Sequence, residues 1–158
     1  MARTSKTLDM WMRVNRLPGG DWLFSRTLCF KAPYFATIRP RVKKLAHGYC
    51  EVQMPKRRAI NNHIGSVHAI AMCNMAELAG GLMTDATVTP AYRWIPKGMT
   101  VAYKHKATTD LVAVGRPAKP DEPLSDGMEY PVSVSITDPQ GREVMTAEIT
   151  MWISAVEQ

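Results

Sequence analysis

The side chains best suited to chemistry in this sequence are Asn62, His68 and Glu77, which lie in one almost uncharged stretch. Residues 59–92 contain no Lys or Arg, and their only other acid is Asp85. Burial disfavours the charged form of an unpaired carboxyl group, which makes Glu77 a candidate general base or nucleophile. The alternative is a structural Glu, hydrogen-bonded to a loop or solvated at an exposed edge.

A long buried helix is predicted to carry these residues. Residues 59–84 contain no Pro and are rich in Ala, Met and Leu, and apolar side chains all round a helix are typical of a buried one. We expect Asn62 or Ser66 near its N-cap and His68 in its first turn. Its small residues would let a sheet pack closely around it: Ala69, Ala71, Ala76, Ala79, Gly80 and Gly81.

The helix start and Glu77 point to a site shared by two copies of the chain. Free backbone N–H groups at a helix start can stabilise an oxyanion, while a lone His there more often fixes the loop than carries a proton. From His68 to Glu77 the helix turns by about 180° and rises by about 13 Å. If both serve one substrate, they must therefore come from different copies, as a two-fold dimer allows.

The elements around this helix read as an antiparallel sheet. A hairpin is predicted at His47-Gly48, and later strands at residues 99–106, 111–114, 130–136 and 145–153 alternate apolar and polar residues. Short connections between neighbouring strands favour antiparallel pairing, so the fold class is α+β with about five to six strands. We expect one domain over residues 1–158, with a helical extension at 1–35 and the core at 36–158.

A family resemblance rests on the run Asn62 to Ala69, followed by Ala76-Glu77. It resembles the N-x-x-G-x-x-H-G-G motif with a later acid that marks phenylacetyl-CoA-type hotdog thioesterases. The overall pattern, over roughly residues 37–156, is similar to the hotdog branch named DUF4442. The resemblance implies a hotdog fold, in which a long central helix is wrapped by the sheet.

The resemblance also implies roles for the motif residues. Glu77 would be the general base or nucleophile, the N–H of Ala69 would polarise the thioester carbonyl, and Asn62 would orient water or the acid. Gly65 would lie against the substrate, and His68 would organise the helix start. Two departures are an Ala69-Ile70 pair in place of Gly-Gly and Glu in place of Asp on the helix.

Residues 101–111 look like the family's strand along the coenzyme A site. Tyr103, Lys104, His105 and Lys106 are the substrate-binding candidates there, because ammonium groups commonly contact phosphate. A solvated strand face is the alternative.

The resemblance therefore implies an acyl-CoA thioesterase, a homodimer or a dimer of dimers with its site at the dimer interface. No cofactor is expected beyond the coenzyme A of the substrate. A non-catalytic acyl or lipid binder on the same fold is the second reading. A hotdog dehydratase is less favoured, because no His and acid are placed to reach across one substrate.

The N-terminal region is predicted to form two short helices, the first near residues 8–17 and the second at 22–34 with Asp21 as its cap, separated by Pro18-Gly19-Gly20. Its aromatic residues either pack on the domain, form a flap over an acyl pocket, or lie on a membrane surface. These residues are Trp11, Trp22, Phe24, Phe30 and Phe35.

The net charge and the cysteine content limit the remaining classes of function. The net charge of +6 suggests an anionic partner, but the basic residues are scattered and have no RNP-like or zinc-finger motif, which disfavours nucleic acid. Three cysteines without metal-ligand spacing predict reduced thiols and no metal site. With no signal peptide and no membrane span in sight, we expect a cytoplasmic protein without stable membrane insertion.

Overall fold

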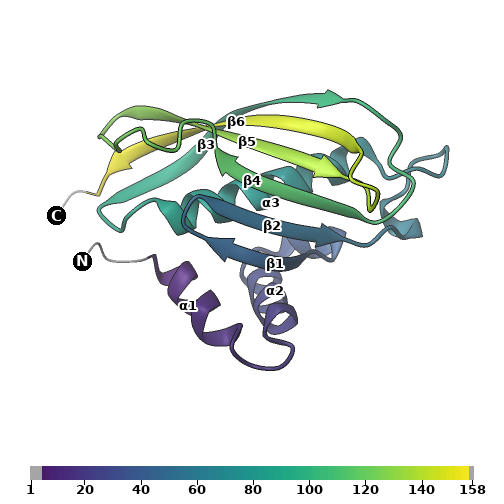
Figure 1. Cartoon of the computed structure of the whole chain (residues 1–158), viewed down its shortest axis with the longest axis horizontal. Coiled ribbons are helices and arrows are strands. Elements are labelled where there is room, and N and C mark those ends of the chain that lie inside the picture. The colour runs from purple at the N-terminus through teal and green to yellow at the C-terminus, as the bar shows by residue number, and fades with distance from the viewer. Residues whose placement is uncertain (1–4, 157–158) are drawn as a thin grey trace.

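The computed structural model describes residues 5–156, which form an antiparallel sheet, a long helix and a group of N-terminal helices (Figure 1). The sheet has six strands in the order β1-β2-β4-β5-β6-β3. The strands are β1 (Arg41–Ala46), β2 (Tyr49–Met54), β3 (Tyr92–Tyr103), β4 (Leu111–Pro117), β5 (Met128–Thr137) and β6 (Glu143–Ala155). No helix among the described residues is long and apolar enough to cross a membrane.

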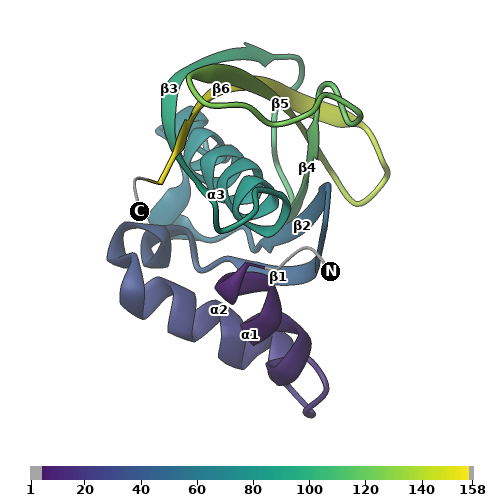
Figure 2. The same cartoon turned by 90° about the vertical axis from the view of Figure 1, so that its left-hand side faces the viewer.

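The long helix α3 (Ala69–Thr87) lies in the hollow of the curved sheet (Figure 2). Glycines permit this close approach: a Cβ on Gly115 of β4 would lie 2.8 Å from the carbonyl oxygen of Ala79. A Cβ on Gly80 would lie 2.8 Å from Cδ1 of Ile149. Both distances are shorter than van der Waals contact allows. The predicted α+β hotdog fold, a central helix wrapped by an antiparallel sheet, is confirmed.

Two helices and a short 3-10 segment precede the sheet: α1 (Lys6–Val14), α2 (Gly20–Lys31) and η1 (Pro33–Ile38). In Figure 2, α1 and α2 lie below the open side of the sheet, next to β1. Trp11 and Phe24 hold α1 and α2 together, with ring centroids 5.1 Å apart in an edge-to-face arrangement.

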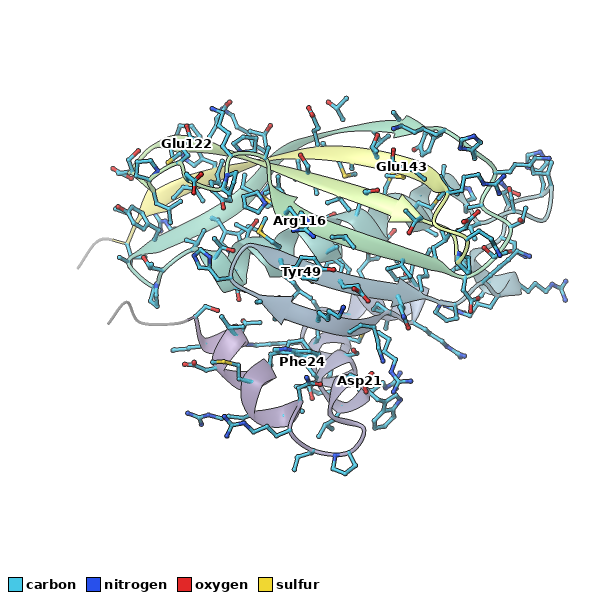
Figure 3. The ribbon with its side chains drawn as sticks, viewed as in Figure 1. Asp21, Phe24, Tyr49, Arg116, Glu122 and Glu143 are labelled. Carbon is cyan, nitrogen blue, oxygen red and sulfur yellow. The ribbon has the colours of Figure 1, made fainter. Side chains whose placement is uncertain are left out.

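An ion-pair cluster attaches α2 to β1. Asp21 accepts hydrogen bonds from Nε and Nη2 of Arg41, both at 2.9 Å, and from Nζ of Lys43 at 2.6 Å. Figure 3 places Asp21 and Phe24 on α2, beside β1. The hydrogen bonds from Arg41 and Lys43 hold the pKa of the Asp21 carboxyl well below its usual range.

Strand β3 forms one edge of the sheet, and among residues 5–156 it pairs with β6 alone. Its pairing shifts register between Pro96 and Gly98, which fits the confinement of Pro to edge strands and bulges. Ile95, Met99 and Tyr103 are exposed along this edge. A long edge strand with exposed apolar side chains is a surface on which another chain can add a strand.

The predicted boundaries of the central helix are wrong at its start. α3 begins at Ala69 and its N-cap is His68, so neither Asn62 nor Ser66 caps it and His68 lies before the first turn. Gly65 lies in the loop before α3, and its φ of +78° is a left-handed conformation that does not occur within a right-handed α-helix.

Two other predicted boundaries differ from the structure. The second N-terminal helix ends at Lys31 rather than at Tyr34, and the 3-10 segment starts two residues later at Pro33. The N-cap of α2 is Gly19 rather than Asp21. β3 begins at Tyr92 rather than at Met99, because the bulge allows Pro96 within a paired strand.

Candidate active site

Asn62 holds the loop that leads into α3. Its Oδ1 accepts hydrogen bonds from the N–H groups of Ile64 and Ser66, both at 3.1 Å, and its Nδ2 donates to Oγ of Ser66 at 2.8 Å. Gly65 supplies the left-handed residue of the loop. Asn62 and Gly65 therefore shape the path by which the chain enters the helix.

His68 determines which N–H groups at the helix start remain free. Its Nδ1 accepts a hydrogen bond from the N–H of Ile70 at 3.1 Å, so the proton of the neutral ring lies on Nε2. The N–H of Ala69, the first of the helix, has no acceptor among residues 5–156. This N–H group is available to polarise a carbonyl oxygen.

Glu77 is exposed, which corrects the expectation of a buried carboxyl group. The sheet covers α3 on one side, while Glu77 lies on the open side of the helix. Its carboxylate makes no hydrogen bond or ion pair with any residue from 5 to 156. It borders a cavity of about 310 Å³.

The cavity beside Glu77 is mostly apolar and is lined by residues of α1, α2, η1, α3, β3 and β6. Its other lining residues are Thr7, Leu28, Phe35, Leu78, Gly81, Leu82, Asp85, Trp94, Pro96 and Met151. A Cβ on Gly81 would lie 3.2 Å from Cη2 of Trp94, so the missing side chain leaves room for the indole. Nε1 of Trp94 donates to Oδ1 of Asp85 at 3.4 Å. Apart from this polar pair and Thr7, the residues that line the cavity together with Glu77 are apolar or Gly.

The helix start opens onto a different and smaller cavity. His68 lines a volume of about 200 Å³ together with Tyr34, Ile70 and Asn74. Glu77 does not line this volume. The two halves of the predicted catalytic group are therefore separated within one copy, as the helix arithmetic predicted.

The end of β3 carries the first of the predicted coenzyme A contacts. The hydroxyl of Tyr103 lies 3.4 Å from Sγ of Cys73 on α3. This hydrogen bond raises the pKa of the Tyr103 phenol, and partial burial adds to the effect. Tyr103 thus joins the edge strand to the open face of the helix.

The three basic residues that follow β3 differ in their partners. Lys104 forms an ion pair with Glu143, and its hydrogen bond holds the pKa of that carboxyl below its usual range. Nδ1 of His105 lies 2.9 Å from the carbonyl oxygen of Glu143. Lys106 is exposed and makes no ion pair within residues 5–156.

The N-terminal aromatic residues lie in three environments: the buried core, the lining of the cavity and the exposed surface. Trp11 and Phe24 are buried, and Phe35 lines the cavity with Glu77, whereas Trp22 and Phe30 are exposed. Phe35 was among the residues considered for a flap over a pocket, whereas the contribution of Leu28 to the cavity was not predicted from the sequence. The available signal was the spacing of Phe24 and Leu28, which puts both on one face of a helix.

No group of three or more His, Cys, Asp or Glu side chains that could hold a metal ion occurs among the residues described. Cys50 and Cys29 are buried, and burial raises the pKa of both thiols, most strongly at Cys50. Their placement suits packing rather than nucleophilic chemistry.

Comparison with known proteins gives a family and a fold. The model of the domain of unknown function DUF4442 matches residues 20–153. A structural-genomics protein of known crystal structure shares 43% identity, with a TM-score of 0.84 over 95% of this chain and 99% of that one. No curated protein matches the sequence.

Two further crystal structures have descriptions that mention a thioesterase. A Pseudomonas aeruginosa protein of unknown function, described as a probable thioesterase, is 25% identical over 89% of this chain and 97% of its own, with a TM-score of 0.73. A Haemophilus influenzae thioesterase is 11% identical over 79% of this chain and 85% of its own, with a TM-score of 0.70. The second likeness concerns the fold alone.

Proposed function

This chain belongs to the DUF4442 family and has the hotdog fold of thioesterases, and from that premise we propose that it hydrolyses acyl-CoA thioesters. The observation that carries the proposal is Glu77, an unpaired carboxylate at an apolar cavity of about 310 Å³. An apolar cavity with few polar groups suits an acyl chain, and a carboxylate beside it can act on the thioester carbonyl.

The proposed reaction uses the helix start and the acid together. The N–H of Ala69 donates to the thioester carbonyl oxygen and stabilises the negative charge that develops there. Glu77 takes a proton from water, which adds to the carbonyl carbon, or attacks that carbon itself to form an anhydride that water then opens. In either case the C–S bond breaks, the fatty acid is released, and the thiolate of coenzyme A takes up the proton.

The site is proposed to form between two copies, because one copy separates its Ala69 and Glu77. A second copy adding antiparallel to the edge of β3 would bring Ile95 and Met99 of both copies into the interface. Each copy would then give its helix start to one site and its acid to the other. Two such dimers can associate further into a tetramer.

Coenzyme A is proposed to lie along the end of β3. Lys106 is the basic residue free to meet a phosphate, whereas Lys104 would share its charge with Glu143. Tyr103 and His105 border the same strand end, and Gly65 borders the helix start. Asn62 is proposed to act through the loop that it holds, by keeping the Ala69 N–H in place.

The test is release of coenzyme A thiol from acyl-CoAs of increasing chain length. We expect Glu77→Gln to reduce kcat by at least about 100-fold, a typical contribution of a general base. Glu148→Gln is the matched control, because Glu148 is an exposed acid of β6 without a partner among the described residues. Equal activity of Glu77→Gln and wild type would remove Glu77 from the mechanism.

A non-catalytic acyl binder is the second candidate, and Ile70 is the observation that favours it. Ile70 replaces a glycine of the motif and is 56% exposed next to the Ala69 N–H, so it narrows the approach to that group. Retention of acyl-CoA through gel filtration, with no thiol released, would support this function instead.

A further inference from the structure

Helix α2 is apolar on two opposite faces, and the protein covers one of them. Phe24 is buried in the core, and Leu28 lines the cavity beside Glu77. Trp22 and Phe30 lie on the outward face with Arg26, at a spacing of four residues, and Leu23 lies beside them. Trp22 is 56% exposed and Phe30 is 91% exposed. Large apolar side chains that are exposed together on one helix face mark an interaction surface, and the described residues 5–156 leave Trp22, Leu23 and Phe30 uncovered.

We name this outward face the α2 face, and it consists of Trp22, Leu23, Arg26 and Phe30. The chain after α2 extends it, because Tyr34 of η1 is 67% exposed. A groove of about 320 Å³ runs beside it, lined by Trp22 and by three arginines, Arg26, Arg39 and Arg41. The groove therefore offers guanidinium groups next to exposed aromatic rings.

The positive charge of the chain is concentrated in its first 58 residues, which include this face. Residues 1–58 carry 13 Lys and Arg against 3 Asp and Glu, whereas residues 59–158 carry 7 against 11. Of the basic residues near α2, Arg13, Arg16, Arg26, Lys31 and Arg39 make no ion pair within residues 5–156. Their charge is therefore available to an anionic partner.

The charge also argues against a second copy as the partner. In a two-fold contact the same patch meets itself, so Arg26 and Lys31 would approach their own symmetry mates. Like charges brought together in an interface cost free energy and disfavour that association.

We propose that the α2 face binds the surface of an anionic lipid bilayer. Trp and Tyr side chains favour the level of the lipid headgroups, and Phe30 and Leu23 would enter the acyl boundary below it. Arg26, Lys31 and Arg39 would contact lipid phosphates. This binding does not depend on the proposed thioesterase activity, although Leu28 on the inner side of the same helix lines the cavity with Glu77.

The test is co-sedimentation of the full chain with vesicles of equal parts phosphatidylglycerol and phosphatidylcholine, against vesicles of phosphatidylcholine alone. We expect binding to the anionic vesicles and its loss at high salt. Phe30→Ser should weaken binding by about tenfold or more, the transfer free energy of a large apolar side chain. Arg26→Gln should weaken it by about fivefold, the contribution of one basic residue at a charged surface.

Val156→Ser and Lys119→Gln are the matched controls, because both residues are exposed and lie outside the α2 face. Unchanged binding by the controls, with the losses above, supports the proposal. Sedimentation that is absent, or equal for Phe30→Ser and wild type, overturns it. Binding to soluble polyglutamate but not to vesicles also overturns it, because the partner would then be an acidic protein. A lower mass of Phe30→Ser than of wild type in solution overturns it as well, because the α2 face would then bind a second copy.

Discussion

His68 and Ala69 divide the hydrogen-bonding work at the start of α3: the His68 ring accepts from the Ile70 N–H at 3.1 Å, and the Ala69 N–H stays free. A ring nitrogen that accepts a hydrogen bond from a backbone N–H group at this position acts as the N-cap of the helix. The hydrogen bond fixes the backbone next to the free Ala69 N–H group. We therefore propose that His68 is a positioning residue for the Ala69 N–H.

Substitutions of His68 separate this role from proton transfer. His68→Asn keeps a side-chain acceptor at the N-cap, and Asn is among the best residues there. We expect it to retain most of the thiol-release activity, whereas His68→Ala should lose stability by about 1 kcal/mol along with activity. Thermal unfolding and kcat measured on both variants give the comparison. If His68→Asn is as inactive as Glu77→Gln while stable, the ring carries a proton.

The cavity beside Glu77 can be made smaller or larger by single substitutions. Gly81→Leu would fill the space against Trp94, whose Cη2 already lies 3.2 Å from a Cβ at this position. Leu28→Ala would open the opposite wall. We expect Gly81→Leu to lower kcat/KM for long acyl chains by about tenfold or more while sparing short ones, because a few methylenes are worth about 1–3 kcal/mol in a pocket.

Leu28→Ala should shift the preferred chain length in the other direction. The measurement is kcat/KM over a series of acyl-CoAs for the two variants and the wild type. Parallel losses at every chain length would show that the acyl group binds elsewhere.

The sequence predicted the helix in its sheet because both signals are local. Apolar residues all round one segment and alternation in the strands need no knowledge of distant contacts. Two glycines permit the close contact between the sheet and α3. Gly80 of α3 lies against Ile149 of β6, and Gly115 of β4 lies against the backbone of Ala79. The spacing of His68 and Glu77 likewise predicted that one copy would separate them.

The exposure of Glu77 was one of two alternatives that the sequence left open, and it could not be decided there because it depends on where the sheet ends. A helix apolar on all sides suggested complete burial, yet the strands leave one side of α3 open. The cavity walls were equally out of reach, since Leu28, Phe35 and Trp94 meet only after the chain has folded. Capping by His68 was missed because Asn and Ser are the usual N-caps, and Asn62 instead holds the preceding loop.

The attachment of α2 to β1 should depend on pH through Asp21. The pKa of Asp21 is lowered in the folded protein by its hydrogen bonds from Arg41 and Lys43, so its charged form stabilises the fold. This contribution is complete above the unfolded pKa of about 3.9 and is lost as the pH falls toward the folded value. Asp21→Asn should therefore unfold at a lower temperature than wild type at pH 7.

The same difference should shrink below about pH 4, where the wild-type carboxyl begins to be protonated in the unfolded chain. We expect a loss of no more than about 1 kcal/mol at pH 7, since Arg41 is partly exposed and solvent screens the pair. Thermal unfolding of both proteins from pH 7 to pH 3 provides the check. A difference that stays constant across this range would assign the effect to packing.

A mixing experiment tests whether Ala69 and Glu77 come from different copies. Ala69→Pro removes the proposed oxyanion donor, and Pro is well tolerated at the first position of a helix, where the N–H has no helical partner. The residue before it is compatible as well, because His68 is extended with φ −65° and ψ 138°. Ala69→Pro and Glu77→Gln should therefore both fold, and each alone should be inactive.

Co-refolding the two variants in equal amounts should restore activity if the site is shared. A mixed dimer has one site with both native groups and one site with neither. Because random pairing makes half of the dimers mixed, we expect about a quarter of wild-type activity. If Ala69 and Glu77 acted within one copy, every copy in the mixture would lack one of the two groups. The recovered activity would then stay at the level of the separate variants, with light scattering showing that mixed dimers had formed.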